Sequence, residues 1–231
     1  MFDRHVINTV DIRKHYYLKE KEVVALNGIT LGIEKGEFIS VMGPSGSGKT
    51  TLMNMLGLLD RPDSGHILFE GRNVQAMGSK ERAFIRGSRI GIIFQSFNLI
   101  PVLSAFENVD FPLRIQGGLG KRERTRLVMG ALDQVGLRNF IDHKPDELSG
   151  GQMQRVAIAR AIVTQPRVII ADEPTGNLDS MTGKAIVDLL KEINRHGENT
   201  VAISTHDPDV MAQTGRIIEI KDGIVTSDTC R

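Results

Sequence analysis

FISVMGPSGSGKT, at residues 38–50, sets the architecture of this 231-residue chain. Residues 38–42 form a short apolar run, typical of a buried β-strand, and lead directly into a loop that matches G-x-x-x-x-G-K-[ST] at every fixed position. Residues 51–59 continue with a helical pattern. Because a strand, a glycine-rich loop and a helix in this order form a phosphate-binding loop, the sequence predicts nucleotide binding within an α/β fold.

The loop residues have distinct tasks. Glycines let the backbone fold tightly, so that several N–H groups point at the phosphates. Lys49 offers a positive charge to the β- and γ-phosphates, and Thr50 offers a hydroxyl to Mg²⁺. A chance turn rich in glycine and serine is the competing interpretation, and the flanking strand and helix argue against it. The expected nucleotide contacts here are Gly43, Pro44, Ser45, Gly46, Ser47, Gly48, Lys49, Thr50 and Thr51.

Two carboxylates end a second apolar run. Residues 168–171 are continuously apolar, which suits a strand buried on both faces, and Asp172 and Glu173 follow directly. Ligands bind beyond the carboxyl ends of such strands, so Asp172 is a candidate to hold Mg²⁺. Glu173 is a candidate to orient or deprotonate an attacking water. The competing interpretation is an acidic turn before Pro174, and a prediction of hydrolysis depends mainly on Glu173.

Residues 148–152, LSGGQ, begin a second helix with anion-binding character. Ser149 and Gln152 have the S-x-x-Q form of a capping box, and Gly150 and Gly151 leave the first N–H groups of the helix uncovered. A helix N-terminus stabilises a charge by only about 0.3–1 kcal/mol, so it would add donors to a phosphate held elsewhere. From these residues alone a capped structural helix is the simpler interpretation, and an anion site stays open.

Composition narrows the class of protein. The 29 Lys and Arg residues against 28 Asp and Glu give a formal net charge of +1, so no basic field draws the chain to nucleic acid. The single cysteine, Cys230, has no disulfide partner within the chain and fits a reducing compartment. No window reaches the roughly 18 apolar residues of a membrane span, and residues 1–5 lack the apolar core of a signal peptide. We therefore expect a cytoplasmic protein that reaches a membrane through a partner.

Strand and helix patterns alternate along most of the chain. Strands are expected at residues 6–10, 29–33, 38–42, 67–69, 90–94, 168–171, 200–204 and 216–220, and helices at residues 51–59, 121–135, 184–195 and 209–213. Between them, residues 104–161 are mostly helical in pattern. The alternation predicts a mostly parallel sheet with helices on both faces, and a helical subdomain inserted into this α/β core.

The phosphate loop, residues 148–152 and the strand ending in Asp172 and Glu173, in this order and spacing, resemble the ATP-binding cassette (ABC) ATPase family over nearly the whole chain. The resemblance implies one domain, 1–231, with a RecA-like P-loop NTPase core in residues 1–95 and 165–231 that includes an N-terminal antiparallel β subdomain. It also implies a helical subdomain in residues 96–164 that carries the signature motif. In that family two cassettes pair head to tail around ATP and Mg²⁺. The implied contacts with ATP held by the second copy are Ser149, Gly150, Gly151 and Gln152.

Single residues match further motifs of the family. Gln95 matches the Q-loop glutamine, which touches Mg²⁺ or the attacking water, and His206 matches the switch histidine that contacts the γ-phosphate. Asp179, in the Asn-Leu-Asp run at residues 177–179, matches the D-loop at the dimer interface, and the resemblance implies that it contacts the nucleotide there. The resemblance thus implies Glu173, His206, Gln95 and Lys49 as catalytic residues, and Thr50, Gln95 and Asp172 as metal ligands.

Tyr16 and Met153 are two further positions at which the sequence can be compared with the family pattern. Tyr16 fits the aromatic position that stacks on adenine, given its distance ahead of residues 24–26, and the adjacent Tyr17 is the alternative. Met153 departs from the family pattern, in which a polar residue is commoner just after the signature. Because Met153 lies beyond the phosphate-contacting amides, we expect no loss of ATP binding from it.

Residues 56–60, 98–112 and 173–179 resemble the lipoprotein-release and macrolide-export branch of the family. That branch implies a homodimer on separate permease subunits at the inner face of the cell membrane, engaged in export. Its permeases transmit force across the membrane instead of passing substrate through a pore. Residues 97–113 are the candidate docking surface for a cytoplasmic helix of the permease, with ordinary subdomain core as the alternative. A cell-division-type cassette that drives a membrane partner without transport is the alternative function. A cassette of translation or DNA repair is disfavoured, because those proteins carry two cassettes or a long coiled-coil insertion.

Overall fold

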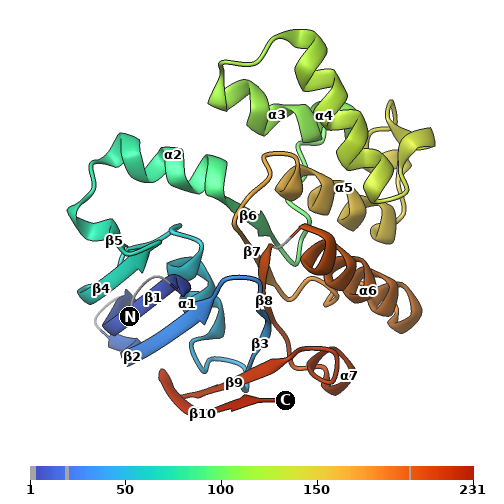
Figure 1. Cartoon of the computed structure of the whole chain (residues 1–231). Coiled ribbons are helices and arrows are strands. Elements are labelled where there is room, and N and C mark those ends of the chain that lie inside the picture. The colour runs from blue at the N-terminus through green and yellow to red at the C-terminus, as the bar shows by residue number, and fades with distance from the viewer. Residues whose placement is uncertain (1–3, 19–20, 198) are drawn as a thin grey trace.

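A six-stranded sheet forms the centre of the molecule in the computed structural model, which describes residues 4–18, 21–197 and 199–231 (Figure 1). Its strand order is β10-β9-β3-β8-β7-β6. All neighbours are parallel except β10, which is antiparallel to β9. The strands are β3 (Phe38–Met42), β6 (Ile90–Ile93), β7 (Val168–Asp172), β8 (Thr200–Ser204), β9 (Arg216–Lys221) and β10 (Ile224–Cys230). The mostly parallel sheet predicted from the sequence is confirmed.

A second, four-stranded sheet is antiparallel throughout and has the order β2-β1-β4-β5. Its strands are β1 (His5–Leu18), β2 (Lys21–Glu34), β4 (Ser64–Phe69) and β5 (Arg72–Asn73). Figure 1 shows these blue and cyan strands on the opposite side of the molecule from the green and yellow helices. The N-terminal antiparallel β subdomain implied by the resemblance is therefore present.

Seven α-helices connect and cover the sheets in the described part of the chain (Figure 1). They are α1 (Lys49–Leu56), α2 (Ser79–Arg89), α3 (Ala105–Gln116), α4 (Lys121–Gln134), α5 (Gly150–Ile162), α6 (Ser180–Gly197) and α7 (Pro208–Met211). Short 3₁₀ turns occur at Val74–Ala76, Arg138–Phe140 and Pro145–Glu147. The helices α3, α4 and α5 pack on one another, and α5 also contacts β6 and α6. The inserted helical part is thus anchored to the core through α5.

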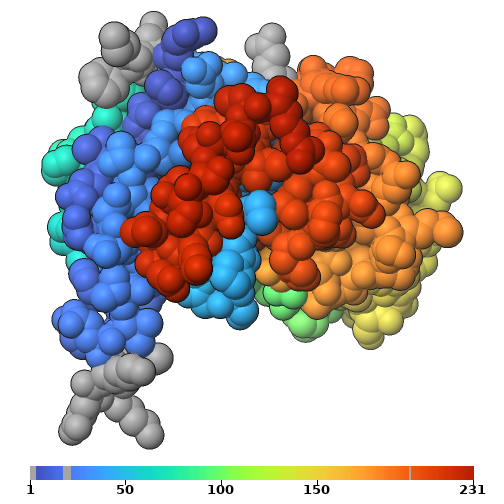
Figure 2. Space-filling model, turned by 90° about the horizontal axis from the view of Figure 1, so that it is seen from below, coloured from blue at the N-terminus to red at the C-terminus, as the bar shows by residue number. Residues whose placement is uncertain are grey.

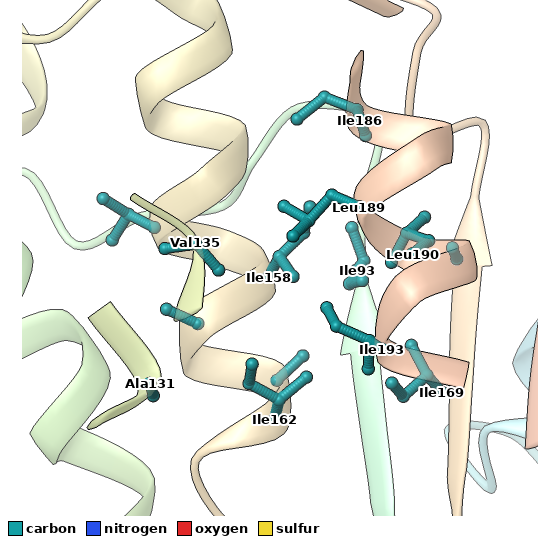
Figure 3. Close-up of a cluster of buried hydrophobic side chains, with 14 of the residues drawn as sticks. Ile93, Ala131, Val135, Ile158, Ile162, Ile169, Ile186, Leu189, Leu190 and Ile193 are labelled. Atoms are coloured by element: carbon teal, nitrogen blue, oxygen red, sulfur yellow. The ribbon is translucent and has the colours of Figure 1, made fainter. Parts of the chain in front are cut away.

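Strand β7 shows how the central sheet is buried on both faces. Val168 and Ile170 pack in the cluster that contains α1 and the antiparallel sheet, whereas Ile169 and Ala171 pack in the cluster that contains α5 and α6. Alternate residues of a strand point to opposite faces, so a strand covered on both sides must be apolar throughout. Figure 3 shows the second cluster, with Ile169 beside Ile193 of α6. This double packing fixes the position of the two carboxylates that follow β7.

The C-terminal strands join the two sheets beneath the phosphate loop. Figure 2 views the molecule from below and shows this red segment beside the blue strands of the antiparallel sheet. In the turn between β9 and β10, the carbonyl oxygen of Gly223 accepts a hydrogen bond from Asn27 N at 2.8 Å. The N–H of Gly223 donates to the carbonyl oxygen of Ser47 at 3.0 Å. The turn therefore braces the phosphate loop from behind.

Some predicted elements differ in extent from the observed ones. The helix predicted at residues 51–59 begins at Lys49 and ends at Leu56, because Leu58 has a φ of 53° that no α-helix accommodates. One face of the central sheet is covered by the antiparallel sheet as well as by α1, so the predicted arrangement of helices on both faces was incomplete. Helix α2 was not predicted, because its sequence is strongly polar and only Ile85 is buried in it. The boundaries 95/96 and 164/165 between core and helical subdomain stay a prediction.

Candidate functional site

A cavity of about 730 Å³ lies between the antiparallel sheet and the loop that connects β3 to α1. Its lining residues are Tyr16, Val23, Val24, Ala25, Gly43, Pro44, Ser45, Gly46, Gly48, Lys49, Thr50, Thr51, Glu173 and His206. Another cavity, beside α6 and α7, has about 740 Å³, so size does not single out the first one. Its lining does, because Gly43, Lys49, Glu173 and His206 line the first cavity and none of them lines the second.

Two glycines let the loop fold tightly against its surroundings. Gly43 has a φ of 154° and Gly48 a φ of 103°, and both lie in the region that favours glycine. A side chain at Gly43 would collide with the carbonyl oxygen of Ile220, and one at Gly48 with that of Ala25. The backbone therefore passes closer to β2 and β9 than any other residue type permits. This compact loop, followed by the N-terminus of α1, is the geometry that binds phosphate groups.

Lys49 is folded into the loop. Its Nζ donates hydrogen bonds to the carbonyl oxygens of Gly43 at 2.7 Å and Pro44 at 2.9 Å, and the residue is 7% exposed. A buried ammonium held only by neutral carbonyls lacks a counter-charge, and a phosphate group in the cavity would supply one. The predicted position of Lys49 at the phosphate site is consistent with this arrangement.

We expect a Lys49→Ala variant to bind ATP about 10- to 100-fold more weakly, because charge-assisted hydrogen bonds are worth about 1.5–3 kcal/mol each. Titration calorimetry with ATP and Mg²⁺ measures the loss. Lys35→Ala, which removes an exposed lysine far from the loop, is the matched control and should bind as the wild type does. Equal affinities in all three proteins would remove Lys49 from the phosphate site.

The two predicted carboxylates follow β7 and are fixed by a residue that sequence reasoning missed. Ser204 ends β8 directly opposite Asp172 in the parallel register. Its Oγ donates to Asp172 Oδ1 at 2.5 Å and accepts from Glu173 N at 2.9 Å. Glu173 has a φ of 44°, a strained backbone of the kind found at functional sites, and its side chain lines the cavity. Ser204 thus orients both acidic residues.

His206 reaches the same carboxylate from the segment after β8. Its Nδ1 lies 3.6 Å from Glu173 Oε1, and its side chain is 73% exposed at the cavity mouth. At this distance an imidazolium would attract the carboxylate, whereas a neutral ring would leave Glu173 free to accept a proton. The structure therefore brings together Lys49, Glu173 and His206 of the four predicted catalytic residues.

The donor set fits a magnesium ion that arrives with its nucleotide. Within residues 4–18, 21–197 and 199–231, no cluster of three or more His, Cys, Asp or Glu side chains could hold a metal on its own. Mg²⁺ characteristically uses one or two protein oxygens together with phosphate oxygens and water. Thr50 at the cavity and Asp172 at the end of β7 offer such oxygens. These residues suit a nucleotide-borne Mg²⁺ rather than a resident ion.

Gln95 and Asp179 do not line this cavity. The side chain of Gln95 lies against Gly176, and the backbone carbonyl oxygen of Gln95 accepts from Asn177 Nδ2 at 3.0 Å. Asp179 Oδ1 accepts from Thr182 N at 3.0 Å, so it caps the start of α6, and the hydrogen bonds from Thr182 lower the pKa of its carboxyl. The predicted roles of Gln95 and Asp179 toward nucleotide and metal stay predictions, because both residues lie outside the cavity of a single chain.

The capping box at residues 149–152 is present as predicted. Ser149 N donates to Gln152 Oε1 at 2.8 Å, and Gln152 N donates to Ser149 Oγ at 3.3 Å. Ser149 is exposed, and none of the residues 149–152 lines the cavity. Figure 1 shows α5 on the far side of β7 from α1. Within one chain the start of α5 therefore cannot contact a nucleotide on the phosphate loop.

Tyr16 and Tyr17 differ in their position relative to the cavity. Tyr16 lines the cavity, 37% exposed, whereas Tyr17 is 73% exposed and its hydroxyl donates to Glu22 Oε1 at 3.2 Å. Of the two, only Tyr16 is placed to contact a base bound next to the phosphate loop. Its stacking on adenine stays a prediction. Thr51 also lines the cavity. Ser47, which was expected to contact the nucleotide, is buried and is not among the lining residues, and its hydroxyl has no hydrogen-bond partner among the described residues.

Known proteins match this chain over nearly its whole length. A family model described as "ABC transporter" matches residues 26–176. YknY of Bacillus subtilis, an uncharacterized ABC transporter ATP-binding protein, is 46% identical and covers 94% of both chains. A macrolide export ATP-binding/permease protein MacB of Syntrophobacter fumaroxidans is 46% identical over 97% of this chain, which spans about a third (32%) of that relative's length.

Solved structures show the same fold. The ATP-binding cassette MJ0796, described as dimeric in a post-hydrolysis state bound to ADP and Pi, superposes with a TM-score of 0.90. It is 42% identical, and the match covers 97% of this chain and 98% of the other. The MJ0796 sequence comes from Methanocaldococcus jannaschii. The fold predicted from the sequence, an α/β core with an antiparallel β part and inserted helices, is confirmed by this likeness.

Proposed function

Because the chain belongs to the ABC transporter family, we propose that it is the ATP-hydrolysing subunit of a membrane transporter and works as a head-to-tail homodimer around two ATP molecules. One observation carries the proposal. The cavity with Lys49 and Glu173 lacks the helix start at residues 149–152, although that helix start is capped and its first residue, Ser149, is exposed. A second copy would bring it to the phosphates, and MJ0796 is described as dimeric with ADP and Pi.

Hydrolysis then follows from the geometry of the cavity. The γ-phosphate lies among the N–H groups of the loop and Lys49, and a water oxygen attacks its phosphorus. The proton of that water passes to the Glu173 carboxylate, the bond to ADP breaks, and phosphate is released. His206 donates toward the γ-phosphate oxygens from the cavity mouth. Thr50 and Asp172 would hold Mg²⁺, which neutralises charge on the phosphate oxygens when bound, and Gln95 would act once the dimer closes.

The likeness to MacB, described as a macrolide export ATP-binding/permease protein, supports the macrolide-export or lipoprotein-release branch and work with a permease at the inner face of the cell membrane. No helix in the described residues is long and apolar enough to cross a bilayer. A cell-division-type cassette that moves nothing across the membrane is the second candidate. Phosphate release by the purified chain tests the ATPase, and co-purification from membranes identifies the partner. ATP-driven movement of a cargo by the purified complex supports transport, whereas ATP hydrolysis by the complex with no cargo moved supports the second candidate.

The predicted docking region, residues 97–113, contains both subdomain core and exposed apolar side chains. Val109 and Leu113 are buried in the helical subdomain, whereas Val102 is 75% exposed and Phe111 is 40% exposed. Exposed Ile115 (71%) on α3 continues this apolar surface. Helix α2 adjoins it, since Gln116 Nε2 donates to the carbonyl oxygen of Gly87 at 2.8 Å. We propose that the exposed side chains contact a cytoplasmic helix of the permease.

Ile115→Asp is expected to weaken co-purification of the membrane partner about tenfold or more, because a buried carboxylate at an apolar contact costs several kcal/mol. Phosphate release by the isolated chain should stay at the wild-type rate, since Ile115 is remote from the cavity. Ile224→Asp, which changes an exposed isoleucine of β10, is the control for surface charge. Equal loss of the partner in both variants would count against a docking surface on α3.

A further inference from the structure

The ring of Tyr16 is held at its tip by the loop that follows α1. Its hydroxyl donates a hydrogen bond to Asp60 Oδ2 at 3.0 Å. Asp60 lies 44 residues further along the chain, between α1 and β4. The ring itself comes from β1 and lines the cavity beside Thr51. Without this contact, a strand side chain that is 37% exposed would be able to occupy more than one rotamer.

Asp60 is itself fixed, so it can serve as a rigid acceptor. Its Oδ1 accepts from Lys14 Nζ at 3.1 Å and from Arg61 N at 2.7 Å, which leaves Oδ2 to face the tyrosine. Lys14 Nζ also donates to the carbonyl oxygen of Arg61 at 2.8 Å, and its side chain is only 12% exposed. The ammonium lies 5.3 Å from the centroid of the Tyr16 ring, within cation–π range.

The protonation states keep this contact in one form near neutral pH. Burial alone would raise the pKa of Asp60, but the hydrogen bonds from Arg61 N, Lys14 and Tyr16 together lower it, so Asp60 stays a carboxylate. Burial and the hydrogen bond to Asp60 both raise the pKa of Tyr16, so its hydroxyl stays a donor. A charged acceptor with a neutral donor makes a stronger hydrogen bond than two neutral groups.

We propose that Asp60, held by Lys14, is a positioning residue that locks the Tyr16 ring in the orientation on which the nucleotide base stacks. This inference rests on the proposed binding of ATP at the cavity. Helix α1 begins at Lys49, which holds phosphates, and the loop beyond the same helix carries Asp60. One helix therefore sets the spacing between the phosphate site and the base platform. A pre-oriented ring loses less conformational freedom on binding, and the base then adds more to the affinity.

Titration calorimetry with two ligands, ATP and inorganic tripolyphosphate, tests the proposal, because only ATP has a base. We expect Asp60→Asn and Tyr16→Phe each to weaken ATP binding about 3- to 10-fold, the size of one hydrogen bond, and to leave tripolyphosphate binding unchanged. The double variant should bind ATP no more weakly than either single variant, since both remove the same contact. Tyr17→Phe, whose hydroxyl bonds to exposed Glu22, is the matched control and should match the wild type.

Three results would overturn the inference. One is wild-type ATP affinity in both single variants. Another is a loss of tripolyphosphate binding as large as the loss of ATP binding, which would mean that the phosphate loop has moved as well. The third is full additivity in the double variant. Failure of the proposed function gives a different result, since the wild-type chain would then bind neither ATP nor tripolyphosphate. Tyr16→Phe keeps the Lys14–Asp60 pair intact, so the test survives if Asp60→Asn folds poorly.

Discussion

A Glu173→Gln variant is expected to hydrolyse ATP about 10²–10⁴ times more slowly than the wild type, the range typical of a lost general base. Glutamine keeps the shape of the side chain but cannot accept the proton of the attacking water. Its backbone contacts with Ser204 remain, so the left-handed turn at this position should persist. The variant should also retain ATP affinity, because Lys49 and the loop are unchanged. Release of inorganic phosphate, measured at saturating ATP, gives the turnover directly.

The same variant should accumulate as an ATP-bound dimer, because a closed site that cannot turn over has no route to reopening. Sedimentation velocity with ATP and Mg²⁺ measures this accumulation, with ADP as the reference ligand. Glu22→Gln is the matched control, because Glu22 is exposed and contacts only Tyr17 among the described side chains. Wild-type turnover in Glu173→Gln would exclude it as the base and leave His206 as the nearest alternative in the cavity.

Local sequence was enough to predict the phosphate-binding half of the site. Residues 38–50 encode their strand, loop and helix start within one continuous segment, because the tasks of glycine, lysine and threonine follow from short-range geometry. The carboxylates after β7 were predictable for a similar reason. A continuous apolar run indicates a strand buried on both faces, and the residues that follow it lie at the carboxyl end of the sheet, where ligands bind.

Contacts between distant segments could not be predicted in this way. Ser204 meets Asp172 across 32 residues, and Asp60 meets Tyr16 across 44, and neither pair has a signal in its own neighbourhood. Parallel pairing of β7 with β8 creates the first contact, and the return of the chain after α1 creates the second. Gln95 illustrates the opposite case, because the sequence predicts it at the nucleotide, whereas its side chain lies against Gly176 and outside the cavity.

The start of α5 has a capping function that any single chain satisfies, and a proposed nucleotide-binding function that requires two chains. The two functions can be separated because the chain carries a second capping box of the same form. Ser104 accepts from Glu107 N at the start of α3, as Ser149 does from Gln152 N at the start of α5. Loss of either cap costs about 1 kcal/mol of stability, so Ser104→Arg is the matched control for Ser149→Arg.

We expect Ser149→Arg to block hydrolysis, which means an ATP turnover rate about 100-fold lower or lower still. The monomer should still bind ATP with the wild-type affinity. A bulky side chain at Ser149 would separate α5 from the phosphates of the second copy, and donors aimed at phosphates are worth roughly 10²–10³ in rate when removed. Ser104→Arg should hydrolyse ATP normally. Wild-type turnover in Ser149→Arg would contradict a shared site.

Mixing inactive variants gives a stronger test of the same prediction. Lys49→Ala leaves the start of α5 intact, and Ser149→Arg leaves the phosphate loop intact. A head-to-tail dimer of the two contains one site in which both halves are wild type, whereas each variant alone contains none. Activity of the mixture should therefore exceed that of both parents and rise with the fraction of mixed dimers. A mixture no more active than its parents would have one of two explanations. Either the phosphate loop and the start of α5 act within one chain, or turnover requires two intact sites.

A tandem fusion of the wild-type chain with a Lys49→Ala, Ser149→Arg double variant decides between these two explanations. The fusion has no fully intact shared site, so only a site within one chain would keep it active.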